Sequence, residues 1–589
     1  MNPEPTSPGA DADAGAQAES ASPPAAGPAD RADAPTAADD APRRVSRAAL
    51  IFTLLASATT FIATILARFH IDPIWDDAFM FQRYAYRLLV EHRVAWNPGG
   101  EPTYGLTSPL FLLVSVPLRV LTRGNQALAV MLSSNLPAIG FVAAWVWLLY
   151  RGVVASPAAK KVALVITAYC LAMSSLVDHA ASGMETTFVI LYATLYLVAA
   201  TTAAGAGTTR RAVVTGIVGG LAFSVRPELA MFTLLIPFAL ALLGERPETK
   251  RVGRIALPIT AGLIALNLLV NRLHFGTALP LPFYAKSLNL YGETIRKTYR
   301  GGTTNELLGF LSSFWPLLAA IGIDAVRLGR RFLRAVGPIE LALLVATTIM
   351  ILYHWIFVLP VMAYSSRFYY PVLPGLLYLA AQAIGRIAAS LPRLEIGAAT
   401  RHLAAAGAMA CLWLTLVPAA FKALKDASRM GFEGRMGRLD VERHAKAEGP
   451  LKYWYKLDEV AKLPNDVVLA STEVGMLGVL VLDKTLIDLA GLHEKSLALA
   501  PLSGDRFFEQ YKPDWIYMPH PDYAPMIDSM RGSKAFADYE EYKHTALGTK
   551  FFGVAIRKDS PHYAAMKALV TPRATTMQPT RSPALAPRQ

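Results

Sequence analysis

Two adjacent carboxylates, Asp76 and Asp77, follow the first long apolar run of the chain. Charged groups beside a membrane-spanning segment are costly to desolvate, so their presence there suggests a function. A positioned carboxylate can act as a general base that removes a proton from an attacking hydroxyl group. In a structural alternative, one of the two caps the helix that follows and stabilises its dipole. The sequence leaves open which aspartate has which role.

Further acidic, basic and aromatic residues recur at the ends of later apolar runs. Lys, Arg and His side chains suit a phosphate leaving group, and aromatic rings suit the faces of sugars or the membrane interface. The candidates for phosphate binding are Arg226, Lys286, Arg367 and His274. Glu185 is the candidate for a second acidic site, and the candidates for substrate contacts are Glu228, Tyr284 and Tyr104.

Structural alternatives stay open for these candidates as well. Glu185 could cap the apolar helix that follows it, and Arg226 and Glu228 could pair with each other. Lys286 and Arg367 could extend to lipid headgroups. His274 is as readily structural as functional, and Tyr364, Tyr369 and Tyr370 are more often members of an interfacial aromatic belt than ligand contacts. The candidates are persuasive as a group, because they recur on one predicted side of a membrane.

The composition indicates an integral membrane protein. The chain has 589 residues, of which 53% are hydrophobic and 17% are charged, whereas soluble proteins of this length carry roughly a quarter charged residues. The net charge of +13 comes from short basic clusters between apolar runs, which is typical of cytoplasmic loops and argues against nucleic acid as a partner. Cys170 and Cys411 lie inside apolar runs, without the spacing of a metal site or a disulfide framework.

The apolar runs predict a polytopic α-helical membrane protein with about eleven transmembrane helices. Basic residues 43–47 hold the N-terminus in the cytoplasm, and each later cytoplasmic loop is again rich in Lys and Arg. The odd number of spans sends the C-terminal part of the chain outside. The predicted spans are 48–66, 126–150, 162–177, 187–203, 212–224, 229–243, 255–270, 307–323, 337–360, 371–384 and 403–420.

The segment 67–125 is predicted as an outer loop that lies on the membrane. Residues 78–92 have apolar positions on one face and Arg83, Arg87 and Glu91 on the other, which indicates an amphipathic helix along the membrane surface. Residues 107–121 form an apolar run that is short for a span. We interpret this run as an interfacial or re-entrant helix, because a crossing there would put the later basic clusters outside.

The remaining segments divide into tails and one soluble domain. Residues 1–42 lack apolar periodicity and are predicted to be a disordered cytoplasmic tail, and 561–589 a second disordered tail. Residues 43–420 form the membrane domain, and 421–560 change in composition to a soluble α/β domain. Its predicted strands are 466–471, 485–489, 515–518 and 551–556. The chain has no glycine-rich phosphate motif for a soluble nucleotide.

Several short motifs, in their order and spacing, resemble a known family. They include residues 76–79, 96–99, 107–110, 182–186, 226–228, 283–286, 473–478 and 487–492. The set is similar to the bacterial GT-C glycosyltransferases around the terminal mycobacterial arabinofuranosyltransferase AftB. The resemblance covers nearly the whole chain after the N-terminal tail. It departs at residues 278–282, Ala-Leu-Pro-Leu-Pro, where the family more often has a Pro-Asn-Thr triplet.

The resemblance implies a GT-C-like fold and a sugar donor linked to polyprenyl phosphate in the outer leaflet. It assigns the base for the acceptor hydroxyl to Asp76 or Asp77, and it gives Glu185 a second acidic contact, with a divalent metal as an additional candidate. The expected acceptor is a cell-envelope glycan or lipid at the outer face of the bacterial inner membrane. The sugar is not fixed by the resemblance.

Two other functional classes stay open at this stage. A transporter or flippase for lipid-linked sugars would place polar groups near the bilayer midplane in broken helices, often within inverted repeats. A non-catalytic envelope protein could use the same scaffold to bind lipid or a partner. The charges of this chain fall in loops on one predicted face, which favours the transferase.

Overall fold

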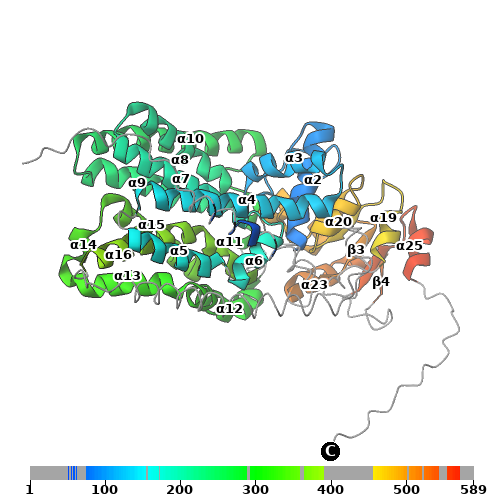
Figure 1. Cartoon of the computed structure of the whole chain (residues 1–589). Coiled ribbons are helices and arrows are strands. Elements are labelled where there is room, and N and C mark those ends of the chain that lie inside the picture. The colour runs from blue at the N-terminus through cyan, green and yellow to red at the C-terminus, as the bar shows by residue number, and fades with distance from the viewer. Residues whose placement is uncertain are drawn as a thin grey trace, which may run out of the picture. The chain divides into compact units, whose positions relative to one another are not determined.

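The computed structural model describes residues 75–153, 157–171, 173–287, 292–358, 364–390, 456–500, 503–519, 523–542 and 553–570, with isolated positions between 51 and 62. All elements discussed below belong to one compact unit, Val45–Gln589. Figure 1 shows a bundle of long helices and a smaller region that contains the sheet.

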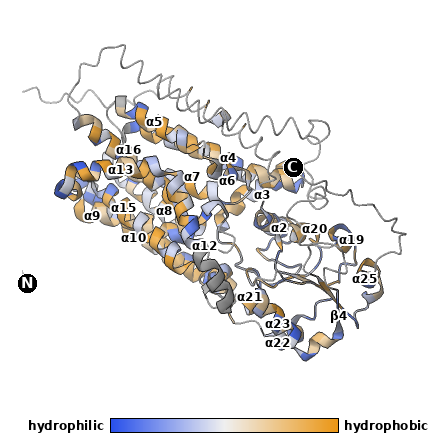
Figure 2. Cartoon of the chain, turned by 90° about the horizontal axis from the view of Figure 1, so that it is seen from below, coloured by the Kyte–Doolittle hydropathy of each residue, from blue (hydrophilic) through white to orange (hydrophobic). Residues whose placement is uncertain are grey.

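Whereas α12 and the first turns of α10 carry polar and charged residues, most helices of the bundle are apolar. Figure 2 shows hydrophobic residues covering them. Their bounds are α4 Gln126–Leu148, α5 Pro157–Leu171, α6 Ser174–Ala181, α7 Thr186–Ala206, α8 Thr209–Val225, α9 Ala230–Leu243, α10 Pro247–Phe275, α12 Gly292–Ser313, α13 Trp315–Leu328, α14 Phe332–Ala335, α15 Pro338–Phe357 and α16 Leu373–Ser390.

Several of these helices can cross a membrane. Within the described residues, five are long and apolar enough, and two bent pairs, in α5–α6 and α12–α13, raise the number to at most seven. Large apolar side chains such as Leu273, Val326 and Phe357 remain exposed on their surfaces, as expected for helices that face lipid. The described part of the chain thus has five to seven apolar helices that are long enough to span a membrane, which is compatible with a membrane protein.

The predicted count of about eleven spans is not confirmed. The predicted spans 212–224 and 229–243 coincide with α8 and α9, but these helices are shorter than the five candidate spans. Spans 162–177 and 307–323 coincide with the two bent pairs. The predicted span 403–420 lies outside the described residues, as does 48–66 apart from isolated positions.

The segment before α4 contains the two predicted helices. The first of them packs against the C-terminal domain, whereas the sequence predicted a helix along the membrane surface. Helix α2, Asp76–Glu91, is followed by the short helix η1, Pro109–Phe111, and by α3, Leu112–Leu121. Arg83 and Arg87 of α2 are buried, so the prediction that they form a solvated face along the membrane was wrong. They contact the C-terminal domain instead, because its backbone carbonyls supply the partners that water would otherwise provide.

The C-terminal domain contains a five-stranded sheet with the order β2-β1-β3-β5-β4. Strands β1, Leu469–Ser471, β2, Leu486–Asp488, and β3, Trp515–Tyr517, are parallel, whereas β5, Val554–Arg557, and β4, Tyr539–Tyr542, are antiparallel. The four predicted strands are present, and β4 is an addition. The helices are α19 Leu457–Ala461, α20 Gly475–Leu480, α21 Lys495–Ala498, α22 Gly504–Tyr511, α23 Ala524–Gly532 and α25 Tyr563–Val570.

The two faces of this sheet pack against different parts of the chain. Alternate strand residues point to opposite faces, so that Leu469 and Leu486 join a core with α2, α3 and α20. Their neighbours Ala470 and Ile487 join a second core with α11, Leu281–Ser287. Helix α25 buries Met566 and Val570 in the first core, so the domain extends past the boundary predicted at residue 560.

A buried ion network links three helices of the bundle. Asp324 of α13 is fully buried and accepts hydrogen bonds from Arg386 of α16 and from Arg327, each at 2.7 Å. The Arg386 guanidinium also pairs with Glu340 at the start of α15. Buried carboxylates are tolerated when they are paired and hydrogen-bonded. Removal of the shared Arg386 leaves Glu340 without its cation and Asp324 with Arg327 alone.

We expect the substitution Arg386→Ala to lower the free energy of unfolding by about 3 kcal/mol, because two buried carboxylates lose their common partner. Arg327→Ala is the matched control, since it removes the more exposed partner of the same Asp324, and it should cost about 1 kcal/mol or less. Unfolding of the detergent-purified proteins measures both effects. Equal losses would show that Arg386 has no special part in the network.

Candidate functional site

Three cationic side chains converge on one aromatic ring. Phe368 lies in η5, Tyr364–Val372, which connects α15 to α16. The Arg226 guanidinium is 5.8 Å from the centre of this ring, the Lys286 ammonium 5.4 Å and the Arg367 guanidinium 5.3 Å. A cation over an aromatic face is stabilised by the ring quadrupole. The three cations were predicted separately, and the fold brings them together from α8, α11 and η5.

Carboxylates surround the same three cations. Asp77 accepts a hydrogen bond of 3.2 Å from Arg367. Arg226 contacts Glu228 at 2.6 Å and Glu185 at 3.7 Å, which confirms the pairing of Arg226 with Glu228 that was considered as an alternative. Glu185 makes no capping hydrogen bond at the start of α7. Asp77, Glu185, Arg226 and Arg367 are all buried, so these charges act on one another through a medium less polar than water.

Some polar atoms of this cluster are buried without a hydrogen-bond partner. Among the described residues they include Glu185 Oε2, Arg367 Nε and Nη1, and the Tyr369 hydroxyl. An unmade hydrogen bond in the interior is costly, and native proteins seldom leave one without a reason. A small hollow opens beside the cluster. Its lining residues are Thr303, Glu306, His354, Val358, Ser366, Phe368 and Tyr369.

The backbone before Arg367 has an unfavourable conformation. Ser365 and Ser366 have φ values of 50° and 62°, in the left-handed region that residues other than glycine seldom occupy. Asp178 accepts a hydrogen bond of 3.2 Å from the Ser365 hydroxyl, and a ring nitrogen of His179 lies 3.0 Å from the Ser365 carbonyl oxygen. Such strain is concentrated at functional sites, where neighbouring contacts maintain it. Here the turn directs Arg367 toward Asp77.

Lys286 has the most unusual acid–base property of the three cations. Burial, and then the positive charge of Arg367, lower the pKa of Lys286 to about 8, and the negative charge of Asp77 opposes part of this shift. Its ammonium group makes no hydrogen bond or ion pair within the described part of the chain. The side chain is thus charged at neutral pH and loses its proton readily at a slightly higher pH.

The two aspartates have different surroundings. Both oxygens of Asp76 are occupied, since they accept hydrogen bonds from the backbone N–H groups of Gly475 and Met476 at 2.8 and 2.6 Å. Burial raises the pKa of Asp76 to about 7, and the two amides oppose that rise. A pKa near neutrality suits a base, but a base must also reach the proton that it removes. Asp77 meets that geometric condition better, because it faces the cations.

Three of the predicted residues lie away from the cluster. His274 is exposed at the end of α10, with its ring against Phe275. Tyr104 is buried, and its ring stacks on the ring of Phe275 with 5.1 Å between the ring centres. The Tyr104 carbonyl oxygen accepts a hydrogen bond from the Leu281 N–H group. Tyr284 packs against the core of the C-terminal domain. Tyr104 and Tyr284 thus contact or belong to α11, and the described ring contact of His274 is with Phe275.

The structure places four further residues near the site that were not predicted as site residues from the sequence. Phe368 and His354 lie among the charges, and Trp75 packs 5.9 Å from the Arg367 guanidinium. Glu473 is in the loop after β1, where burial and then the charges of Asp76 and Asp77 raise its pKa well above the usual range. Its position was recognisable in principle, because ligands of α/β domains bind at the carboxyl ends of parallel strands.

The residues do not fit a divalent metal ion. Among the described residues, no group of three His, Cys, Asp or Glu side chains is placed to hold one. The two carboxylates that were candidates, Asp77 and Glu185, each face an arginine. Because a guanidinium already supplies positive charge at each of them, no step proposed below uses a metal.

The described residues form a mostly helical fold with candidate membrane spans, in which three cations and three carboxylates gather, most of them buried. No protein-family model matches the chain, and no curated protein matches it either. The arrangement itself can bind an anionic group at the cations and remove a proton at Asp77.

We expect Phe368→Leu to lower the free energy of unfolding by about 1 to 2 kcal/mol more than Phe141→Leu, because the first substitution removes a ring that three cations share. Phe141 is buried in the bundle without a cation among its described contacts, so its variant measures the loss of packing alone. Unfolding of the purified variants gives the comparison. Equal losses would mean that the Phe368 ring serves only as packing.

Proposed function

We propose that this chain is an integral membrane glycosyltransferase of the GT-C type, which moves a sugar from a polyprenyl-phosphate donor to a hydroxyl group of a cell-envelope glycan or lipid. The observation that carries the proposal is the convergence of Arg226, Lys286 and Arg367 on Phe368, with the carboxylate of Asp77 beside them. The apolar helices around the cluster suit a donor that stays in the membrane. The proposed location is the outer face of the bacterial inner membrane.

In this proposal the cations bind the donor phosphate. The bond between the anomeric carbon and the phosphate oxygen breaks during transfer, and negative charge grows on the departing polyprenyl phosphate. Preorganised cations in a dry site stabilise such charge strongly. Among the described residues, Nε and Nη1 of Arg367 have no hydrogen-bond partner, so each offers a donor for a phosphate oxygen, from different edges of the guanidinium group. The adjacent small hollow is lined by Glu306 and Tyr369, whose side chains carry groups that can form hydrogen bonds to a hydroxyl.

Asp77 acts as the general base. The acceptor hydroxyl oxygen forms a bond to the anomeric carbon, and its proton passes to the Asp77 carboxylate. Arg367 holds this carboxylate in place through a hydrogen bond of 3.2 Å. Glu185 and Glu228 orient Arg226. Proton transfer to a positioned side chain commonly contributes a factor of about 10² to 10⁴ to the rate.

We expect Asp77→Asn to reduce sugar transfer at least about 100-fold, because the amide cannot accept the proton. Transfer is measured with a radiolabelled polyprenyl-phosphate sugar extract and membranes that contain the variant. Asp559→Asn, at a carboxylate on the surface of the C-terminal domain that is 77% exposed, is the control and should keep wild-type activity. Full transfer by a folded Asp77→Asn protein would exclude this base.

The proposal also predicts a pH dependence for donor binding. The pKa of Lys286 is lowered to about 8, so the ammonium charge is present below that pH and is lost as the pH rises through it. The ratio kcat/KM for the donor should therefore fall above about pH 8. Lys286→Arg should remove this decline, because arginine stays charged. An unchanged profile in the variant would show that Lys286 does not bind the phosphate.

A further inference from the structure

Helix α2 of the membrane domain holds both ends of helix α20 of the C-terminal domain. At the start of α20, the Asp76 carboxylate accepts hydrogen bonds from the N–H groups of Gly475 and Met476. These amides have no partner inside their own helix. A negative charge at this end is also favoured by the helix dipole. Asp76 therefore caps a helix, as one alternative from the sequence held, but the capped helix is α20 and not its own.

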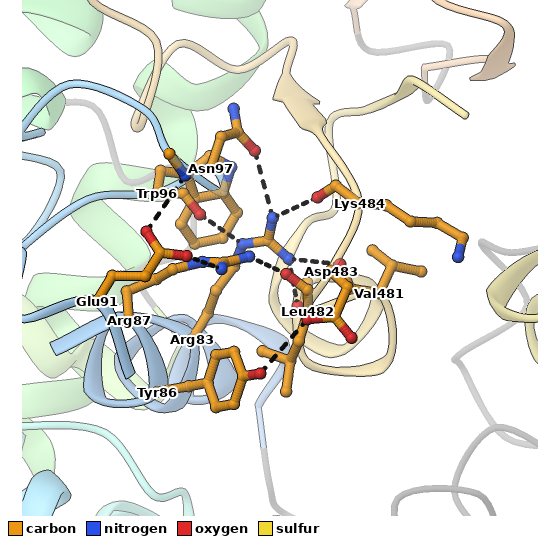
Figure 3. A network of polar contacts seen from close by, with 12 residues as sticks. Arg83, Tyr86, Arg87, Glu91, Trp96, Asn97, Val481, Leu482, Asp483 and Lys484 are labelled. Carbon is orange, nitrogen blue, oxygen red and sulfur yellow. Dashed lines mark hydrogen bonds and ion pairs between the residues drawn. The ribbon is translucent and has the colours of Figure 1, made fainter. Parts of the chain in front are cut away.

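The other end of α20 receives a positive charge from the same face of α2. The Arg83 guanidinium donates to the carbonyl oxygens of Gly478 at 2.5 Å and Val481 at 3.0 Å, and to that of Lys484 at 2.9 Å. Figure 3 shows Arg83 directed into the turn that follows α20. Carbonyl groups at the end of a helix need donors, and a cation there is favoured by the dipole.

The spacing of the two side chains matches the length of α20. Residues seven apart lie on one face of a helix, about 10 Å along its axis. The six residues of α20 span about 9 Å. The two helices thus run side by side in the same direction. Their approach is close at Gly475, where an added Cβ atom would lie only 1.8 Å from the Asp76 carbonyl oxygen.

Further contacts extend this interface beyond the two ends. Trp96 donates from its indole to the Leu486 carbonyl oxygen at 2.9 Å and stacks on His493. Arg87 pairs with Glu91 and donates to the Leu482 carbonyl oxygen. Helix α11, which carries Lys286, is packed in the second core of the same domain. Two elements that bear residues of the cluster are therefore seated on the C-terminal domain.

We propose that the C-terminal domain positions the base: α20, held by Asp76 and Arg83, fixes the first turn of α2 and thereby the direction of Asp77. Asp76 is then a positioning residue and not the base. The catalytic role of Asp77 rests on the proposed glycosyltransferase function, whereas the contacts that hold its backbone do not.

The position of residue 77 can be measured without an activity assay. A single-cysteine protein is made with Asp77→Cys, while Cys170 and Cys411 are replaced by alanine. The purified protein is treated with a water-soluble maleimide. Since Asp77 is only 6% exposed, the cysteine should react slowly. Adding Asp76→Ala should raise the labelling rate about tenfold or more, because hydrogen bonds to a charged group are lost. Asp559→Ala should leave the rate unchanged.

Milder variants keep the test informative if Asp76→Ala fails to fold. Asp76→Asn retains one acceptor oxygen for the amides of α20, and Arg83→Lys retains the charge with fewer donors. Both should increase labelling less than Asp76→Ala. Unchanged labelling in all three variants would overturn the proposal.

Transfer assays with Asp77 intact separate a positioning residue from a base. Asp76→Asn should recover a substantial part of the kcat that Asp76→Ala loses, with KM for the polyprenyl-phosphate sugar unchanged. An Asp76→Asn protein as inactive as Asp76→Ala would make Asp76 the base and overturn the proposal. If wild-type membranes transfer no sugar while the labelling pattern is as expected, the proposed function fails and the positioning contact stands.

Discussion

The structure depends on the partners that α2 supplies to the two ends of α20. A helix of six residues has more unpaired backbone groups at its ends than hydrogen bonds within it. If those backbone groups were buried without hydrogen-bond partners, the hydration free energy that they lose would exceed the stabilisation from the few hydrogen bonds within the short helix. Asp76 and Arg83 provide the missing acceptor and donors with charges that suit the helix dipole. The membrane domain and the C-terminal domain consequently share one core.

This shared core places the charged cluster. Because α2 and α11 pack on the C-terminal domain, the positions of Asp77 and Lys286 are fixed by that domain. The helical bundle positions Arg226 and Arg367 next to them. Three cations and three carboxylates in a buried site nearly balance, which makes their burial tolerable. The hydrogen bonding of these charged groups is incomplete, because among the described residues Arg367 and Glu185 have side-chain atoms without a hydrogen-bond partner. The unused donors of Arg367 are the feature on which the proposed binding of a donor phosphate rests.

The sheet contributes through its orientation. Its first strands, β1, β2 and β3, are parallel, and the loop after β1 carries Glu473 before α20 begins. The carboxyl edge of a parallel sheet is where α/β domains usually bind ligands. In this protein the first turn of α2 occupies part of that edge, so a conventional binding surface serves as a contact between domains. Glu473 remains near the two aspartates and electrostatically coupled to them.

The sequence by itself determined the apolar helices of membrane-spanning length, the strands β1, β2, β3 and β5, and the residue types of the cluster. Hydrophobic run length and period are local properties, and paired charges beside apolar runs are conspicuous because they are costly. It could not separate Asp76 from Asp77, because adjacent residues have the same local signal. Their difference comes from Gly475 and from Arg367, which lie about 400 and 290 positions further along the chain. Likewise, Arg83 and Arg87 followed the pattern of a solvated helix face, and only the tertiary structure buried them, because it supplied backbone carbonyls in place of water.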